Sequence, residues 1–308
     1  MKKSLLAVVA ALAIAGCSQT EIDGIDNGEK AKNVEMEFST GIGKASRAAD
    51  YVDQNLRDAG MKVYSYLTDN TTPAFTDTYM DGVLYTYDTA WEPSIAGTTY
   101  YWPKDKYLHF IAVPNGASYA NQTISATDGT DLVVAYLPEQ NASSNSGKVS
   151  LSFKHILTKV NFETSLTETS DNGLILKIGS ITLKGVIGGS AATYNIIGNS
   201  WNLGSISAKE YSYDPTEAKP SLMLFPQTFT TNPTVEVTYT VENKIGDKTY
   251  IVDSGTKIAS IPTSTVTWIP GKNIKYSLGI PFKGTKMTVD ALVDEWDEEV
   301  AGDTPVNN

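Results

Sequence analysis

Apolar and polar residues alternate along most of this chain, and this period of two constrains the fold more than any other feature. In the first example, Val34, Met36 and Phe38 alternate with two glutamates. Because successive side chains of a strand point to opposite faces, the pattern predicts half-buried strands. No window carries a long stripe at helical spacing, so we expect an all-β protein.

Turn signals of Asp, Asn, Gly and Pro separate further runs of the same kind. These runs predict strands at residues 61–66, 83–87, 107–113, 132–136, 149–153, 174–184, 192–197, 221–225, 234–241, 249–252, 273–281 and 287–293. Short, regularly spaced strands without intervening helices indicate antiparallel β-sandwiches. The apolar phase slips by one residue around His155. A bulge or break is expected there, and we place a domain boundary at this point.

Composition excludes several classes of function. The 308 residues suffice for two domains, each with its own core. A formal net charge of −11 leaves no basic stripe for nucleic acid. A single cysteine excludes an intramolecular disulfide and a cysteine-based zinc cage. Two histidines leave little for a metal site or a Ser-His-Asp triad.

The N-terminus has the pattern of an export signal. Residues 1–16 combine a basic start with an apolar run too short to span a bilayer, and Ile14-Ala15-Gly16-Cys17 resembles a lipobox. We therefore expect lipidation of Cys17 after cleavage by signal peptidase II, although an ordinary signal peptide would show the same apolar run. Acyl chains would anchor the chain stably to a membrane. Residues 17–33 are polar and acidic, and we interpret them as a tether.

Residues that could carry catalysis form no convincing site. The acidic run at 294–299 predicts a solvated charge cluster, and the Asp-Gly-Thr-Asp at 128–131 predicts an Asp-capped turn rather than a calcium loop. We expect structural roles for His109 and His155. The glycine-containing segment 185–189 is followed by no helix and so fails as a nucleotide motif. The sequence predicts no enzyme, no metal and no cofactor.

Several segments carry a family resemblance in a fixed order along the chain. They are Tyr101-Trp102-Pro103 before Leu108-His109-Phe110, then FKHILTKVNF at 153–162, LFPQ at 224–227, WIPGKNIKYSL at 268–278 and VDALVDEW at 289–296. Together with the lipobox, this set resembles the fimbrillin family of type V pilus subunits from Gram-negative anaerobes. The resemblance implies two antiparallel β-sandwich domains of transthyretin-like topology. With the break near His155, we expect them at residues 34–155 and 156–308.

The resemblance also implies a route of assembly. The precursor is expected to travel by the lipoprotein export machinery to the outer membrane. An arginine-specific protease then removes the first strand, here expected at residues 34–42 with Val34, Met36 and Phe38 on its apolar face. A strand from a neighbouring pilus subunit fills the groove that remains, so that the mature form lies at the cell surface in an adhesive fimbrium.

The positions of the arginines agree with this route. Arg47 and Arg57 are the two arginines of the chain, and Arg47 follows the first strand in a run of small residues. Loops of this kind are preferred protease sites, so cleavage after Arg47 is expected and Arg57 is the lesser candidate. Two surface arginines could also lie close together by chance.

The C-terminal part supplies a candidate donor strand. Met287, Val289, Ala291 and Val293 share one face of a run that would extend about 30 Å, enough to cross a sandwich. The same strand could simply complete its own domain. An alternative function is a surface lipoprotein that never polymerises and binds glycans, because five tryptophans and many tyrosines could stack on sugars.

Overall fold

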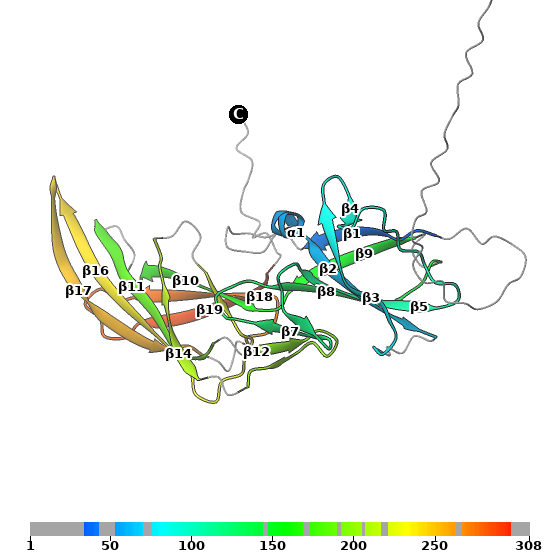
Figure 1. Cartoon of the computed structure of the whole chain (residues 1–308). Coiled ribbons are helices and arrows are strands. Elements are labelled where there is room, and N and C mark those ends of the chain that lie inside the picture. Colours follow the sequence, from blue (N-terminus) through cyan, green and yellow to red (C-terminus); the bar gives the residue numbers. More distant parts are fainter. Residues whose placement is uncertain are drawn as a thin grey trace, which may run out of the picture.

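The computed structural model describes residues 34–42, 53–69, 75–143, 147–168, 173–189, 192–204, 207–216, 221–262 and 267–296. In this part of the chain nearly all regular structure is strand, and the one helix, α1 (Asp53–Ala59), has seven residues. The expectation of an all-β protein is therefore confirmed. Two β-rich halves lie end to end in an elongated molecule (Figure 1).

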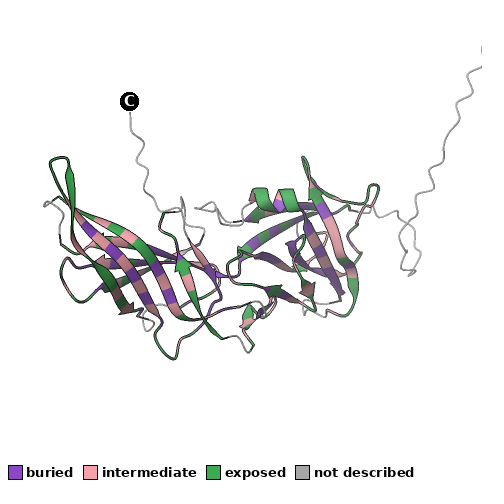
Figure 2. Ribbon diagram, turned by 60° about the vertical axis from the view of Figure 1, so that its left-hand side comes forward, coloured by how far each residue is buried: buried purple, intermediate pink, exposed green. Residues whose placement is uncertain are grey.

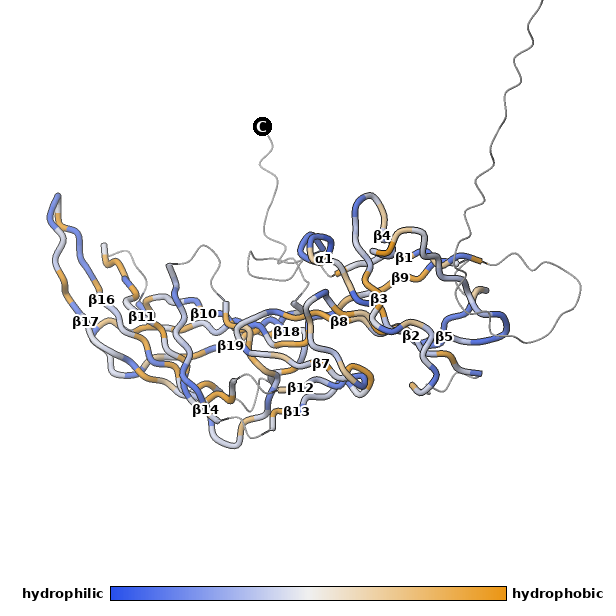
Figure 3. Tube along the Cα trace, viewed as in Figure 1, coloured by the Kyte–Doolittle hydropathy of each residue, from blue (hydrophilic) through white to orange (hydrophobic). Residues whose placement is uncertain are grey.

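The strands of the N-terminal half form a sheet that closes on itself. Its order is β1 (Glu37–Ile42), β4 (Trp91–Pro93), β3 (Thr78–Tyr87), β2 (Met61–Thr68), β5 (Tyr107–Pro114), β8 (Val133–Gln140) and β9 (Lys148–His155), which returns to β1. Alternation determines which side chains enter the core. In β9, for example, Val149, Leu151 and Phe153 are buried between exposed neighbours. Figure 2 shows this alternation of burial along the strands, and Figure 3 shows it in hydropathy.

Two four-stranded sheets form most of the C-terminal half. One has the order β15 (Leu222–Leu224), β10 (Thr158–Leu166), β18 (Lys272–Ile280) and β19 (Thr288–Glu295). The other has the order β14 (Ala208–Tyr213), β11 (Leu174–Ile187), β16 (Thr234–Ile245) and β17 (Lys248–Ser260). Their inner faces share one apolar core, in which Phe162 and Tyr276 of the first sheet pack with Val237 of the second.

A fourth sheet joins the two halves. Its order is β13 (Ser200–Asn202), β12 (Ala192–Asn195), β7 (Thr123–Ala126) and β6 (Tyr119–Ala120). Here β7 from the first half pairs antiparallel with β12 from the second, with Ala126 opposite Ala192. Because the ladder crosses between the halves, they are connected by main-chain hydrogen bonds as well as by the linker.

The expected break at His155 is present. Strand β9 ends at His155 and β10 begins at Thr158. The two intervening residues are tied to both halves, since the N–H of Ile156 donates to the carbonyl of Leu132 and the carbonyl of Leu157 accepts from Gly271. The one-residue slip in the sequence thus marks the passage of the chain from the first half to the second.

Two strand pairs depart from the expected antiparallel pattern. β1 runs parallel to β9, and β10 runs parallel to β18. Both pairs join strands more than a hundred residues apart, and parallel neighbours require long connections. Alternation in sequence fixes which face is buried and leaves the direction of the partner open, so these pairings could not be anticipated.

Candidate functional site

β1 is the strand that closes the N-terminal sheet. It pairs in parallel with β9 over six residues, from Glu37 opposite Lys148 to Ile42 opposite Phe153. On its other side it makes a single antiparallel pair with β4, Phe38 opposite Trp91. The remaining six strands are ordered β4-β3-β2-β5-β8-β9 and need no contribution from β1 for their own ladders. Removal of β1 would therefore open the barrel without breaking another strand pair.

The inward side chains of this segment are large and buried. Met36, Phe38 and Ile42 belong to the core of the N-terminal half. The ring of Phe38 lies 4.6 Å from that of Tyr85 and 5.9 Å from that of Phe110, measured between centroids. Val34 was expected on the same apolar face, but it precedes β1 and is exposed. Loss of the strand would leave a groove lined by aromatic and aliphatic side chains.

Burial in this core changes the acidity of Tyr85. Desolvation raises the pKa of its hydroxyl well above the usual value, and the nearby hydroxyls of Tyr100 and Tyr79 and the carboxylate of Glu35 raise that pKa further. The ring of Phe38 in β1 is one of the groups that bury Tyr85. An opened groove would let water reach Tyr85 and return its pKa toward the ordinary range.

Hydrogen bonds hold both ends of the segment. The N–H of Met36 donates to the carbonyl of Tyr100 over 2.9 Å, and the N–H of Trp102 donates to the carbonyl of Val34 over 2.9 Å. At the other end the N–H of Ile42 donates to the Asp53 carboxylate, 2.9 Å away at the start of α1. All three bonds use main-chain groups of the segment, which another extended strand could also supply.

The indole of Trp91 also holds the strand, because its Nε1–H donates to the hydroxyl of Thr40 over 3.0 Å. Beside Trp91 a hollow of about 580 Å³ runs along β1. Residues of β1, of β4 and of the segment 95–100 line it. The strand is therefore packed firmly toward the core and only loosely on its β4 side.

The two expected modification sites, Cys17 and Arg47, lie outside the described residues. Arg57 is described and lies in α1. Its guanidinium carbon is 4.4 Å from the centroid of the Tyr87 ring, and the preceding residue, Leu56, is fully buried. A protease that needs an extended substrate would have to unwind this helix, so the geometry disfavours Arg57 as a cleavage site.

The candidate donor strand is β19, and it lies in its own half as an edge strand. It pairs antiparallel with β18. Met287 is buried, Val289 and Ala291 are partly buried against the C-terminal core, and Val293 is exposed. The expected common face therefore packs at its beginning and reaches solvent at its end.

The two histidines occupy buried positions within strands. His109 is fully buried in β5, and its Nδ1 accepts the N–H of Glu139 at 3.4 Å. Burial lowers the pKa of His109, while the Glu139 carboxylate acts in the opposite direction. His155 lies beside Asp131, with 2.9 Å between Nδ1 and a carboxylate oxygen. No group of three potential metal ligands occurs among the described residues.

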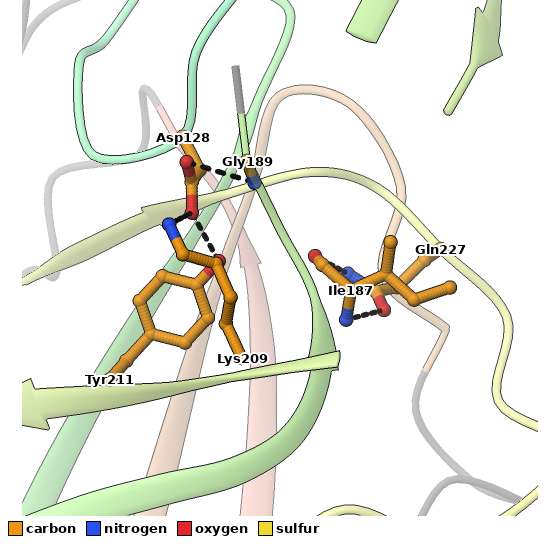
Figure 4. Close-up of polar contacts among 6 residues, drawn as sticks. All are labelled: Asp128, Ile187, Gly189, Lys209, Tyr211 and Gln227. Carbon is orange, nitrogen blue, oxygen red and sulfur yellow. Dashed lines mark hydrogen bonds and ion pairs between the residues drawn. The ribbon is translucent and has the colours of Figure 1, made fainter. Parts of the chain in front are cut away.

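The junction between the halves contains the polar contacts that sequence reasoning missed. The side chain of Asp128, expected only to cap a turn, is almost fully buried, and its carboxylate accepts hydrogen bonds from the N–H of Gly189 at 3.1 Å and from the hydroxyl of Tyr211 (Figure 4). Lys209 lies 3.3 Å from the same carboxylate. Burial and Asp128 together raise the pKa of Tyr211. No sequence signal links residues 61 to 83 positions apart.

Gln227 makes a second set of polar contacts near this junction. Its amide accepts the N–H of Ile187 at 2.9 Å and donates to the carbonyl of the same residue at 3.1 Å (Figure 4). Gln227 was part of the segment that carried the family resemblance. The side chain of Gln227 thus supplies hydrogen-bond partners for both main-chain groups of Ile187. We attribute its presence in that segment to these bonds and not to ligand binding.

The tryptophans form no exposed platform for sugars. Trp91, Trp102, Trp268 and Trp296 are buried, and Trp201 is partly buried against other core residues. Stacking on a glycan needs an accessible ring face, so packing explains the tryptophans, while Tyr101 and Tyr250 are exposed. In the part of the chain that the structure describes, no helix has the length and apolar character to cross a bilayer.

Comparison with known proteins gives a consistent result. A sequence model of a family described as fimbrillin-like matches residues 46–296. The fimbrium subunit Fim1C of Phocaeicola vulgatus is 24% identical over 393 aligned positions, which cover 99% of this chain and 99% of that protein. The match therefore extends over both halves and both termini.

Solved structures share the fold. A fimbrial protein from Bacteroides vulgatus has a TM-score of 0.64 at 17% identity, covering 85% of this chain and 99% of its own. A protein from Bacteroides uniformis, assigned to cell adhesion, has a TM-score of 0.54 at 17% identity, covering 87% of this chain and all of its own. At these identities the similarity concerns the arrangement of the strands.

Proposed function

The chain belongs to the fimbrillin-like family, and from this premise we propose that it is a structural subunit of a pilus that polymerises by strand exchange. In this proposal the precursor is exported as a lipoprotein anchored through Cys17 to the outer membrane. Cleavage after Arg47 frees β1, and a strand of the next subunit takes its place. The subunit acts at the cell surface in adhesion, with other pilus subunits as its partners and without catalysis.

The observation that carries the proposal is the position of β1. It closes a barrel whose other strands pair without it, and it contributes buried side chains rather than a complete hairpin. Arg47 falls in the segment 43–52, between β1 and α1. One cut there separates the strand, the tether and the lipid from the remainder of the chain.

The candidate donor run shares the two-residue spacing of the first strand. The inward positions of the first strand read Met36, Phe38, Thr40 and Ile42. The run Met287, Val289, Ala291 and Val293 places apolar side chains at the same spacing, with smaller side chains at its last three positions. At about 3.3 Å per residue, the eight residues of β19 span about 26 Å, more than the six of β1. This match supports β19 as the donated strand.

The division at His155 has a role in the proposal. We propose that residues 34–155, with the barrel that β1 closes, form the accepting domain and residues 156–308 the donating domain, both of transthyretin-like topology. The separate cores around Phe110 and Tyr276 support this division. A chain with an acceptor at one end and a donor at the other polymerises head to tail.

Limited digestion tests the proposal. The full-length precursor is treated with an arginine-specific protease and followed by intact mass and native sizing, alongside the variants Arg47→Lys and Arg57→Lys. We expect the wild type and Arg57→Lys to lose residues 1–47 and form ladders of oligomers. Arg47→Lys should stay intact and monomeric. Cleavage at Arg47 followed by no assembly at any concentration would overturn polymerisation.

A further inference from the structure

Trp296 lies in a buried slot at the junction of the two halves. Its ring stacks on the imidazole of His155 with 4.3 Å between centroids and an angle of 2° between planes. The ammonium of Lys159 lies 5.4 Å from the Trp296 ring centroid, within the range of a cation–π contact. Asp131 in turn contacts His155. An aromatic side chain from the C-terminal end of the described chain is thus held by residues of β9 and β10.

This slot anchors the end of β19. Trp296 directly follows the strand, and its N–H donates to the carbonyl of Gly271 over 3.0 Å. Between Met287 at one end and Trp296 at the other, both almost fully buried, the strand has exposed apolar residues such as Leu292. Apart from its ladder with β18 and the partial burial of Val289 and Ala291, the strand is held at its two ends.

His155, on which the Trp296 ring stacks, belongs to β9, the strand that pairs in parallel with β1. His155 is the last residue of β9, and Phe153, two residues earlier, is the partner of Ile42 in the parallel ladder. Loss of β1 turns β9 into an edge strand and removes the Ile42 side of this ladder. Residues 148–153 then lose their ladder, and among the described strand pairs β9 keeps only those of Lys154 and His155 with β8.

The indole of Trp296 also lacks a hydrogen bond that a comparable buried tryptophan makes. Its Nε1 has no hydrogen-bond partner among the described groups. The indole of Trp268, equally buried, donates to the hydroxyl of Tyr276 over 2.9 Å. A buried donor without an acceptor destabilises the folded state, so this site holds Trp296 less firmly than a fully hydrogen-bonded site would.

We propose that His155 and Trp296 form a latch through which removal of β1 loosens the hold on β19. With β1 in place, ordered β9 presents His155 and keeps Trp296 in its slot. After processing, β9 is held by its two pairs with β8, His155 shifts away from Trp296, and the donor strand detaches from β18 more readily. The latch rests on the proposed function, because it links processing of a subunit to its ability to donate.

Hydrogen exchange measured by mass spectrometry tests the latch in the wild-type chain. Amides of residues 288–296 are compared before and after cleavage at Arg47, at a concentration that keeps the subunit monomeric, and only in molecules that have released the fragment 1–47. We expect their exchange to accelerate at least about tenfold, while amides of β16 stay unchanged. Unchanged protection of residues 288–296 after loss of β1 would overturn the latch.

Matched histidine variants separate the latch from general destabilisation. His155→Ala should give fast exchange of residues 288–296 both before and after cleavage, so that cleavage adds nothing. His109→Ala removes an equally buried histidine that does not touch the slot, and the acceleration on cleavage should persist. Equal loss of the acceleration in both variants would refute a specific role for His155.

Assembly in the same samples distinguishes the failure of the latch from failure of the proposed function. Polymers that form while residues 288–296 keep their protection in the monomer contradict the latch and leave strand exchange intact. A chain that loses β1, loosens β19 and still never polymerises contradicts the proposed function instead.

Discussion

Phe38 places its ring 4.6 Å from that of Tyr85, between centroids, although the two residues lie 47 positions apart and on strands that do not pair with each other. The core of the N-terminal half thus depends on a side chain from a strand outside every hairpin. The precursor needs this strand to complete its core, and one cut separates the strand from the rest of the chain. A subunit with both properties can fold first and accept a neighbour's strand later.

Replacing Phe38 with alanine should destabilise the N-terminal half of the precursor. Truncation of a buried phenylalanine costs about 3–5 kcal/mol, because apolar contact is lost and a cavity remains. The free energy of unfolding from urea denaturation measures the loss. The same change should speed release of the cleaved strand, since the strand is held mainly by this burial.

Glu37→Gln is the matched control for Phe38→Ala. Glu37 lies next to Phe38 on the exposed face of β1, and surface substitutions of this kind change stability by about 0.5 kcal/mol or less. Equal destabilisation by both variants would show that β1 is not held by its inward face.

Acidification should weaken the N-terminal half through His109. Burial lowers the pKa of His109 in the folded chain, whereas the unfolded chain titrates near 6.5. The unfolded state therefore binds more protons as the pH falls below that value, and stability falls with it. Thermal unfolding midpoints between pH 7.5 and 5.5 measure this slope.

His109→Gln removes the titrating group while keeping an acceptor for the N–H of Glu139. We expect a shallower dependence of the midpoint on pH over the same range. A slope identical to that of the wild type would assign the pH dependence to other groups.

Removal of the Asp128 carboxylate should weaken the junction between the halves. Asp128→Ala leaves the N–H of Gly189 and the hydroxyl of Tyr211 without their acceptor, at a cost of about 2–3 kcal/mol. Lys209→Met is the control, because Lys209 is half exposed and such ion pairs contribute about 1 kcal/mol or less. Urea denaturation gives both values, and equal effects would contradict the assigned roles.

Alternation in the sequence predicted the strands because burial in a β-sheet has the same period of two. The slip at His155 marked the end of β9 for the same reason. The first strand was expected to include Val34, yet β1 begins at Glu37 and runs to Ile42, within the range 34–42 given for it. The pairing with β9 continues through Gly41 to Ile42, the end of that range.

Long-range partners could not be predicted from local pattern. The parallel ladder of β1 with β9 joins residues 111 positions apart. The shared sheet of β7 and β12 rests on runs of four residues. Trp296 stood in an acidic run expected to be solvated, and it lies in a buried slot because His155 supplies a flat partner for its ring. Each of these contacts depends on three-dimensional proximity that one sequence does not encode locally.

A reversible cross-link between β18 and β19 tests whether the C-terminal strand is donated. Ser277 and Asp290 are direct partners on the exposed side of that ladder, and Ser277→Cys with Asp290→Cys, in a Cys17→Ser background, allows a disulfide. We expect cleaved, oxidised subunits to remain monomeric and to polymerise after reduction, as followed by native sizing. Equal assembly of the oxidised and the reduced subunits would mean that β19 stays in its own half.

The central claim is that β1 must leave its groove before a neighbour can enter, and a tether across the groove tests it most directly. The hydroxyls of Ser39 and Ser150 lie 3.1 Å apart on the paired strands β1 and β9. Cysteines at both positions, in a Cys17→Ser background, would hold the strand in place after cleavage at Arg47. Native sizing of the cleaved protein should show monomers when oxidised and a ladder of oligomers after reduction. Polymerisation of the oxidised, tethered subunit at the rate of the reduced one would contradict the account.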